Sequence, residues 1–219
     1  MPASARASRN TAVNALKRDL IREAAKRVFV ARGLSAASVR EIAQQAGYTT
    51  GAIYFHYASK EEIYADVLRE SLSALHEAVS SAAAAENKPV EALVAAYRAF
   101  IAFYRAKPQD LSLGLYLFEG AGPRGLSSAL NRDLNERFLG VMKIFEEGLA
   151  AARVDRRARK VEAVALFNEM VGLLIAANTG RLAVFGVDAD AMVERQVAWL
   201  PRRVRALARQ KTPARGSAD

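Results

Sequence analysis

The side chains that most often do chemistry in proteins are few in this sequence. Its 219 residues include two histidines and no cysteine, which excludes a thiol nucleophile, a disulfide and a thiolate metal site. His56 and His76 are too far apart to form an HxxxH metal-ligand pair, and no GxGxxG or GxxxxGK[ST] loop is present to hold a phosphate. The GAGPRG segment at residues 120–125 is expected to join helices. We therefore expect no enzyme, no cofactor and no metal site.

A different chemistry is suggested by residues 38–60, which combine polar, basic and aromatic side chains with turn signals. Ser38 can cap a short helix whose apolar residues recur at three- and four-residue spacing. Gly47 can take the left-handed conformation that ends this helix, and Thr49 or Thr50 can cap a second one. Two helices joined by such a turn form the helix-turn-helix pattern, whose second helix can lie in the DNA major groove. Two packed helices of an ordinary bundle would show the same spacing.

A longer pattern of residues surrounds this motif and favours the first of these interpretations. The residues that carry it are Ile21, Ala24, Ala25, Phe29, Gly33, Ser38, Val39, Ile42, Ala43, Ala46, Gly47, Gly51, Tyr54, His56, Ser59, Lys60 and Glu61. In this register, residues 17–68 resemble the amino-terminal domain of the tetracycline-repressor (TetR) family of transcription regulators. The departures are mild: Ala37, Tyr48 and Tyr57 stand where the family often has threonine, valine and phenylalanine. The resemblance implies an all-α fold of nine helices, with a DNA-binding head and a helical ligand-binding and dimerisation body.

The resemblance also implies which residues contact DNA. Arg40 is expected to reach a guanine edge or a phosphate, since its planar guanidinium suits either target. Thr50, Gly51 and Tyr54 match positions that approach base edges. The positions that match phosphate contacts are Thr49, Tyr54, His56 and Lys60, and Ser38 at the start of the first helix completes the expected set. Judged from the residues alone, Tyr54 could belong to the core and Lys60 could be merely solvated.

The placement of charge agrees with contact to a polyanion. The formal net charge is +9, and residues 1–60 contain ten Lys or Arg against three Asp or Glu. Residues 202–219 contain six against one. A basic head is what the release of counterions from DNA phosphates requires. A solvated surface that keeps the protein soluble is the alternative, more plausible for the carboxyl-terminal run than for the head.

Helical periodicity predicts the chain's organisation, because neither a strand pattern nor a repeat is apparent. Five regions are expected: a basic disordered arm at 1–13, the helix-turn-helix domain at 14–58, a connecting helix at 59–84, a ligand-binding and dimerisation domain at 85–210, and a disordered tail at 211–219. The expected helices cover residues 14–32, 38–46, 50–57, 59–84, 90–106, 109–119, 126–153, 156–184 and 189–208.

A homodimer is expected because one short recognition helix covers few base pairs. Two heads about 34 Å apart would enter successive major grooves of a roughly palindromic operator. The family dimerises through its last two long helices, and here these helices carry more apolar positions than one internal neighbour requires. The residues expected at the interface are Phe167, Met170, Val171, Leu174, Val197 and Trp199. The alternative is that they pack only within one chain.

The middle helices carry aromatic residues at helical spacing, which is usually a sign of core packing. In the family, however, these helices surround a pocket for an inducer, and mostly apolar cavities with few polar groups are the usual ligand sites. The residues expected to bind the ligand are Tyr97, Phe100, Tyr104, Tyr116, Phe138, Met142, Phe167 and Asn178.

The sequence as a whole is thus interpreted as a ligand-responsive regulator of transcription, a repressor that a small apolar or amphipathic inducer releases from its operator. We expect a cytoplasmic protein without a membrane partner, since its longest apolar run, residues 170–177, is too short to span a bilayer. The rival interpretation is a helical small-molecule-binding or scaffolding protein whose helix-turn-helix serves packing only. The sequence does not name the inducer or the operator.

Overall fold

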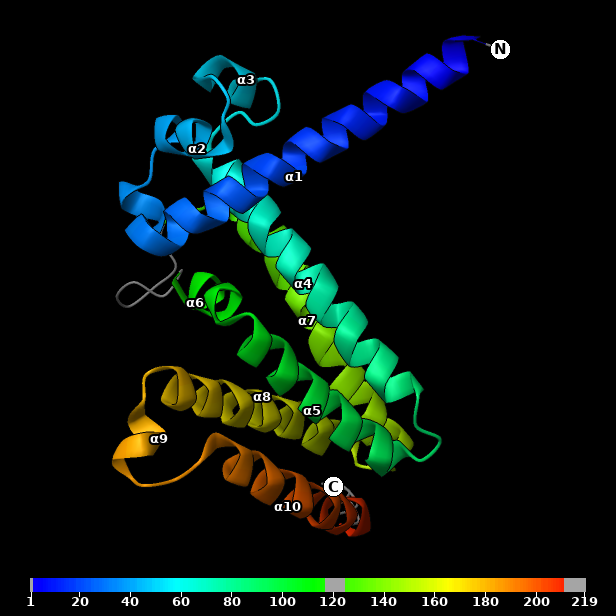
Figure 1. Cartoon of the computed structure of the whole chain (residues 1–219). Coiled ribbons are helices and arrows are strands. Elements are labelled where there is room, and N and C mark those ends of the chain that lie inside the picture. The colour runs from blue at the N-terminus through cyan, green and yellow to red at the C-terminus, as the bar shows by residue number, and fades with distance from the viewer. Residues whose placement is uncertain (1, 117–124, 211–219) are drawn as a thin grey trace, which may run out of the picture. The chain divides into compact units, whose positions relative to one another are not determined.

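The computed structural model describes residues 2–116 and 125–210, and within these residues every regular element is an α-helix (Figure 1). The expected all-α fold class is therefore confirmed. The chain divides into two compact units: residues 1–71 with 109–136, and residues 72–108 with 137–219. Residues 109–136, expected in the ligand-binding domain, thus belong with the head. The expected tail at 211–219 lies outside the described residues.

The first unit is built around α1 (Pro2–Ala36), which packs on α2 (Val39–Ala46), with α3 (Thr50–Tyr54) against α2. The first residues of α4 (Lys60–Ala84), α6 (Pro108–Tyr116) and the start of α7 (Ser128–Ala151) complete it. Its largest buried side chains include Phe29 and Tyr64, whose rings meet edge to face at 5.0 Å. Tyr64 also donates a hydrogen bond to the Leu113 carbonyl at 2.5 Å, which ties α4 to α6.

The beginning of α1 corrects one expectation. Residues 1–13 were expected to be disordered, but α1 begins at Pro2. The sequence PASARASR explains the difference, because proline suits the first helical position and alanine and arginine are strong helix formers. Gly33 breaks the helix as expected: its φ of 74° and ψ of 168° are not helical, and a short helical segment follows to Ala36.

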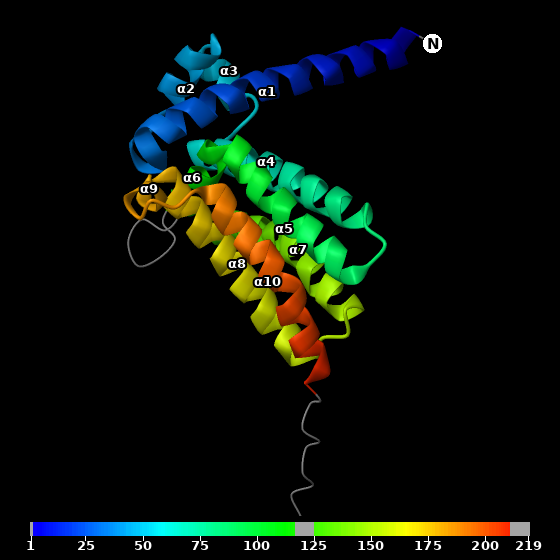
Figure 2. The same cartoon turned by 60° about the horizontal axis from the view of Figure 1, so that its bottom comes forward.

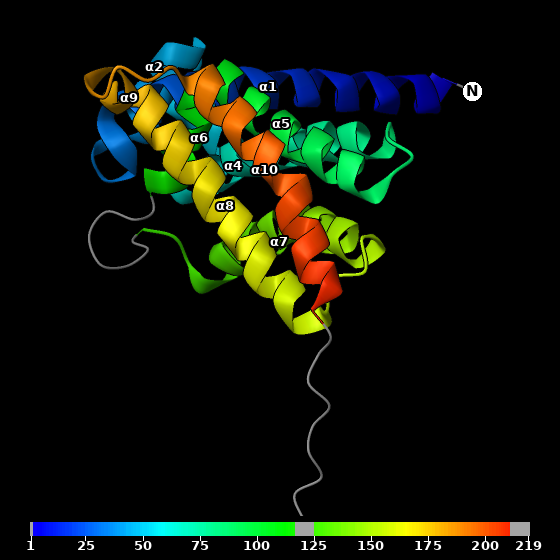
Figure 3. The same cartoon turned by 90° about the horizontal axis from the view of Figure 1, so that it is seen from below.

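The second unit consists of the remainder of α4 and α7 together with α5 (Pro89–Ala106), α8 (Arg156–Asn178), α9 (Arg181–Val184) and α10 (Ala189–Arg209). Helix α10 packs on α5 and α8, and Figures 2 and 3 show α8 and α10 side by side. The helix expected over 156–184 is interrupted at Gly180, whose left-handed φ of 69° separates α8 from α9. The described residues therefore form ten helices where nine were expected. Pro201 lies inside an uninterrupted α10.

Candidate nucleic-acid interface

The two short helices of the head are fixed by hydrogen bonds between residues close in sequence. Ser38 and Glu41 form a capping box: the Glu41 amide donates to the Ser38 hydroxyl at 3.2 Å, and the Ser38 amide donates to the Glu41 carboxylate at 3.1 Å. Gly47 ends α2 in the left-handed conformation, with φ 72° and ψ 28°. The Thr49 hydroxyl accepts from the Ala52 amide at 3.2 Å and begins α3. The predicted caps are thus confirmed.

The core beneath these helices leaves their polar residues outside. Ile42, Ala43 and Ile53 are almost completely buried. Of the predicted contact residues, Arg40, Thr49, Gly51 and Tyr54 are exposed, and Ser38, Thr50, His56 and Lys60 are partly exposed. Tyr54 is 55% exposed, so its alternative assignment to the core is wrong. A Cβ added at Gly51 would meet no atom within 4 Å, which leaves the backbone of α3 open to close approach.

Lys60 is neither free nor simply solvated. Its Nζ donates to the carbonyl of Ser35 at 2.9 Å and to that of Ala37 at 3.0 Å, which joins the start of α4 to the end of α1 and the residue that follows it. These bonds bring a positive charge to the amino end of α2, next to Ser38. An ammonium group has three N–H donors, so one remains for a further acceptor such as a phosphate.

Phe55 is an exposed residue that the sequence reasoning missed. Helix α3 is shorter than expected and ends at Tyr54, and Phe55 is its carboxyl-terminal cap residue. The Phe55 side chain is 78% exposed, and its ring contacts the edge of His56 at 5.1 Å. One helical turn separates Phe55 from Gly51, so the two share the face of α3 opposite the buried Ile53. The signal was available in the sequence, since both residues lie at helical positions away from Ile53.

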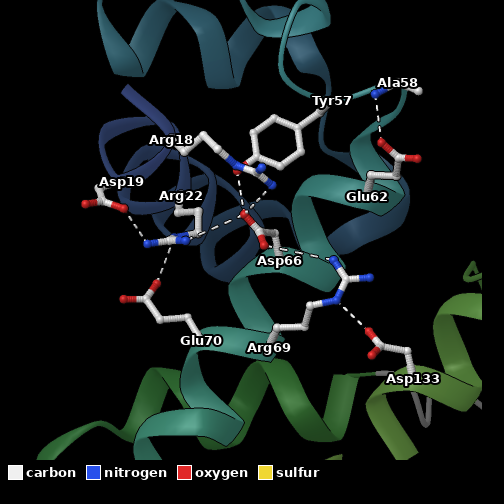
Figure 4. A network of polar contacts seen from close by, with 10 residues as sticks. All are labelled: Arg18, Asp19, Arg22, Tyr57, Ala58, Glu62, Asp66, Arg69, Glu70 and Asp133. Carbon is white, nitrogen blue, oxygen red and sulfur yellow. Dashed lines mark hydrogen bonds and ion pairs between the residues drawn. The ribbon is translucent and has the colours of Figure 1, made fainter. Parts of the chain in front are cut away.

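A polar network holds the end of this motif against α1 and α4, and its centre is Asp66 (Figure 4). Tyr57, buried after α3, donates to Asp66 Oδ2 at 2.6 Å, and Arg18 Nη2 donates to the same oxygen at 3.3 Å. Arg22 and Arg69 place guanidinium nitrogens 3.7 and 3.9 Å from the Asp66 carboxylate. Burial and the hydrogen bond to Asp66 raise the pKa of Tyr57 to about 12. The network therefore keeps Tyr57 protonated, a donor that fixes the exit from α3.

The outer part of the network reaches α7. Arg69 Nε donates to Asp133 Oδ2 at 2.5 Å, and Arg22 Nε lies 2.9 Å from Glu70 Oε2 (Figure 4). A separate ion pair between Lys26 and the buried Asp110 joins α1 to α6. Within the first unit, polar contacts thus fasten the exit from α3 to α4, α1 to α6, and α4 to α7.

Two hollows in the first unit border these elements. One of about 460 Å³ lies between α1 and α2 and is lined mainly by polar side chains, among them Arg27, Arg32 and Gln44. The other, of about 190 Å³, lies between α1 and α3. The residues that line it are Lys17, Ile21, Tyr48, Ala52, Phe55 and His56.

The residues expected to bind a ligand do not all come together. Tyr97, Phe100, Tyr104 and Met142 are buried in the second unit, where the ring of Phe100 contacts that of Tyr104 at 5.1 Å. Burial raises the pKa of Tyr97 to about 12, and its buried hydroxyl has no hydrogen-bond partner among the described residues. Phe138 and Phe167 are partly exposed, with ring centroids 4.9 Å apart, and Asn178 is exposed. Tyr116 ends α6 in the first unit.

The residues expected at a dimer interface also divide into two groups. Met170, Leu174 and Val197 are buried within the second unit, so for them the alternative of packing within one chain holds. Phe167 and Val171 are partly exposed. Trp199 is 52% exposed, with Arg202 above its ring at 5.5 Å. Three further apolar residues of α8 are exposed: Val161, Val164 and Ile175.

Helix α8 also bears on the question of membranes. Within the part of the chain that the structure describes, it is the one helix long and apolar enough to cross a bilayer, with a mean hydropathy of 1.4 in its most apolar window and 33% of that window buried. Core helices pass the same test, and here Glu162 and Glu169 of α8 both bind Arg203 of α10. Over the same described residues, no three His, Asp or Glu side chains gather to hold a metal ion.

Comparison with known proteins connects this geometry to a family. The sequence model of bacterial regulatory proteins of the tetR family matches residues 21–67. The HTH-type transcriptional repressor KstR2 of Mycolicibacterium smegmatis is 35% identical over 85 residues, which cover 39% of this chain and 42% of that protein. The chain thus spans less than half the length of the curated relatives that it matches.

Solved structures extend the likeness in fold to most of the chain. A tetR-family regulatory protein from Rhodococcus RHA1 has a TM-score of 0.70 at 22% identity, over 86% of this chain and 96% of that one. The regulator FadR of Bacillus subtilis, solved in complex with stearoyl-CoA, has a TM-score of 0.68 at 19% identity, over 83% and 96%. Residues 21–67 thus match the tetR family of bacterial regulatory proteins in sequence, and most of the chain is similar in fold to solved regulators.

Proposed function

We propose that this protein is a sequence-specific DNA-binding repressor that acts as a homodimer on a roughly palindromic operator. The observation that carries the proposal is the rigidly capped pair α2 and α3, which keeps Ile42 and Ile53 inside and Arg40 and Tyr54 outside. Because these side chains form an exposed polar edge on a fixed frame, α3 can enter a major groove without rearrangement. The repressor assignment is supported by the name of the KstR2 relative. Action on the chromosome would place the protein in the cytoplasm.

The roles within the interface follow from chemistry and position. Arg40 is exposed and can bind a guanine edge with two hydrogen bonds, while Thr50, Gly51 and Tyr54 face the bases. Thr49, His56 and Lys60 bind phosphates, and Ser38 places the positive end of α2 beside Lys60.

The test is selection of bound duplexes from a random pool, followed by affinity measurement on the enriched sequence. We expect a roughly palindromic site and a strong fall in affinity with salt. Arg40→Ala should weaken specific binding by about tenfold or more, since a bidentate contact to guanine discriminates by about 1–3 kcal/mol. Arg157→Ala is the matched control, because it removes the same charge from an exposed position in the second unit. Absence of salt-dependent binding to any duplex would leave the rival scaffolding role.

For the homodimer we propose an interface on the exposed faces of α8 and α10. Val161, Val164 and Ile175 recur at helical spacing on α8, and Trp199 adds an exposed aromatic side chain on α10. Val164→Asp should shift the protein toward a monomer in analytical ultracentrifugation. Leu139→Asp on α7 is the control, because Leu139 is similarly exposed but lies on another helix. Equal dissociation by both variants would refute this interface.

For the effector we propose a small apolar or amphipathic molecule bound among the helices of the second unit. The support is the aromatic interior and the buried Tyr97 hydroxyl, which has no hydrogen-bond partner within residues 2–116 and 125–210 and which a polar group of a ligand could satisfy. Ligand binding would favour a spacing of the two heads that no longer fits the operator. Each tenfold loss of operator affinity needs about 1.4 kcal/mol of difference in ligand binding between the two states. Molecules extracted from the purified protein should release the operator from wild type and less readily from Tyr97→Phe.

A further inference from the structure

The hollow of about 190 Å³ between α1 and α3 has an apolar floor and a basic rim. Ile21, which is 1% exposed, lies at the floor with Ala52. Lys17 from α1 and His56 from the end of α3 line it, and Phe55 and Tyr48 complete the wall. Two side chains that carry or can acquire a positive charge thus face one small space on the side of α3.

Arg18 adds a third cationic group, held by its neighbours. Its guanidinium carbon lies 5.0 Å from the centre of the Tyr57 ring, and its Nη2 donates to Asp66 at 3.3 Å (Figure 4). The Arg18 side chain is nevertheless 45% exposed. A guanidinium has five N–H donors, so contact with Asp66 and Tyr57 fixes its plane and leaves donors for an outside acceptor.

These three groups are close enough to affect one another. Burial lowers the pKa of His56, and the positive charges of Arg18 and Lys17 lower it further. Tyr48 also lines the hollow, and the carboxylate that faces Arg18, that of Asp66, already contacts Arg22, Arg69 and Tyr57 as well. The cluster is therefore a basic site, and a bound anion would reduce the repulsion among its positive charges.

We propose that Lys17, Arg18 and His56 form a binding site for one phosphate of the DNA backbone, and that His56 takes up a proton from solvent when this phosphate binds. The inference rests on the proposed DNA binding and adds two residues of α1 and a dependence on pH. The neutral imidazole becomes an imidazolium that donates to the phosphate oxygen, beside a lysine and an arginine that already carry charge.

The sign of the pH dependence follows from linkage. In the free protein the pKa of His56 lies below its ordinary value of 6.5, so the imidazole is neutral near pH 7. A bound phosphate stabilises the charged form, so binding takes up a proton and operator affinity rises as pH falls toward and through that pKa. One proton per subunit limits the gain to about tenfold per pH unit per subunit, and we expect about threefold or more between pH 7.5 and 6.0.

The chain offers a clean control, because it contains only two histidines. Affinity for the selected duplex is measured from pH 5.5 to 8.0 at constant ionic strength, for wild type, His56→Gln and His76→Gln. Wild type and His76→Gln should bind more tightly as pH falls, and His56→Gln should lose this dependence. Lys17→Gln should weaken binding to every duplex alike and reduce the dependence on salt by about one counterion per subunit. Equal melting temperatures of the variants exclude loss of folding as the cause.

Three outcomes would overturn the proposal, and they differ from failure of the proposed function. Wild type could bind the selected duplex with a pH-independent affinity, or His56→Gln could keep the full pH dependence. Inorganic phosphate at millimolar concentration could shift the His56 ring resonances in NMR as strongly as the duplex does, which would make this a site for free phosphate. If wild type binds no duplex at all, the DNA-binding function itself is wrong.

Discussion

Both units of the molecule have aromatic residues in their cores, and they differ in where other aromatic residues and the ion pairs lie. The first unit exposes Tyr54 and Phe55 beside basic residues, and three of its ion pairs meet at the nearly buried Asp66. The second unit buries Tyr97 and Phe100 and places most of its ion pairs, such as that of Arg98 with Glu194, at the surface. Exposed aromatic residues on a rigid frame suit contact with an outside partner, whereas buried ones hold helices together. The contrast agrees with the proposed DNA recognition by the first unit, while the buried aromatic residues of the second unit hold its helices together.

The largest loss of stability is expected from a substitution in the aromatic core of the second unit. Phe100 is 1% exposed and contacts Tyr104 and Phe145. Phe100→Ala should lower the free energy of unfolding by about 3–5 kcal/mol, because it leaves a cavity in a packed core. Urea unfolding followed by circular dichroism measures the change.

Phe103 provides the control on the same helix. Its side chain is partly exposed and lies under Lys107, with the ammonium 4.8 Å from the ring centre. Phe103→Ala should therefore lower the free energy of unfolding clearly less than Phe100→Ala. Equal losses would show that the two sides of α5 do not differ, and the division between core and surface in the second unit would be wrong.

A smaller loss of stability is expected from a substitution at Asp66, the centre of the polar network in the first unit. Asp66→Asn removes the negative charge that faces Arg18, Arg22 and Arg69 and disturbs the acceptor of Tyr57. We expect a loss of about 1–3 kcal/mol in the free energy of unfolding, since charged hydrogen-bond partners are left unmatched in a partly buried place. The exposed Glu70 is the control, and Glu70→Gln should cost less. A loss no greater than that of Glu70→Gln would mean that Asp66 does not organise the network.

What the sequence could predict depended on how far apart the interacting residues are. The caps at Ser38, Gly47 and Thr49 were predicted because each acts on backbone groups within a few residues. The contacts of Tyr57 with Asp66 and of Lys60 with Ser35 were not predicted, because hydrophobic periodicity does not indicate which distant polar groups contact each other. Tyr57, seen in the sequence only as a departure from phenylalanine, thus uses its hydroxyl in the fold.

Two helix boundaries were also missed, because apolar periodicity does not indicate where they fall. The break between α8 and α9 depends on one left-handed glycine, Gly180, in a stretch whose apolar pattern continues through it. The early start of α1 depends on helix formers without an apolar face, which periodicity does not detect. On α8, spacing alone did not separate the buried Met170 from the exposed Val164, because apolar residues occur on more than one side of this helix.

The amino-terminal cap of α2 should have a moderate effect, confined to the first unit. Ser38→Ala removes the hydroxyl that accepts from the Glu41 amide, and such changes cost about 1 kcal/mol. Ser73→Ala on the exposed face of α4 is the control and should be neutral or slightly stabilising, since alanine is the better helix former. Urea unfolding of both variants measures the difference. If Ser38→Ala cost no more than Ser73→Ala, the capping box would not contribute to holding α2.

The smallest effect on stability, and the sharpest test of the contrast, is expected at Phe55. Because its side chain is 78% exposed, Phe55→Ala should change the free energy of unfolding by less than about 0.5 kcal/mol, unlike Phe100→Ala. If the ring instead contacts the 5-methyl group of a thymine in the major groove, the variant should bind the selected duplex less tightly. Replacing the thymines of that duplex by uracil removes only the methyl groups, so wild type should lose affinity while Phe55→Ala loses little more. Equal sensitivity of both proteins to uracil would show that Phe55 does not read thymine and that its exposure has another cause.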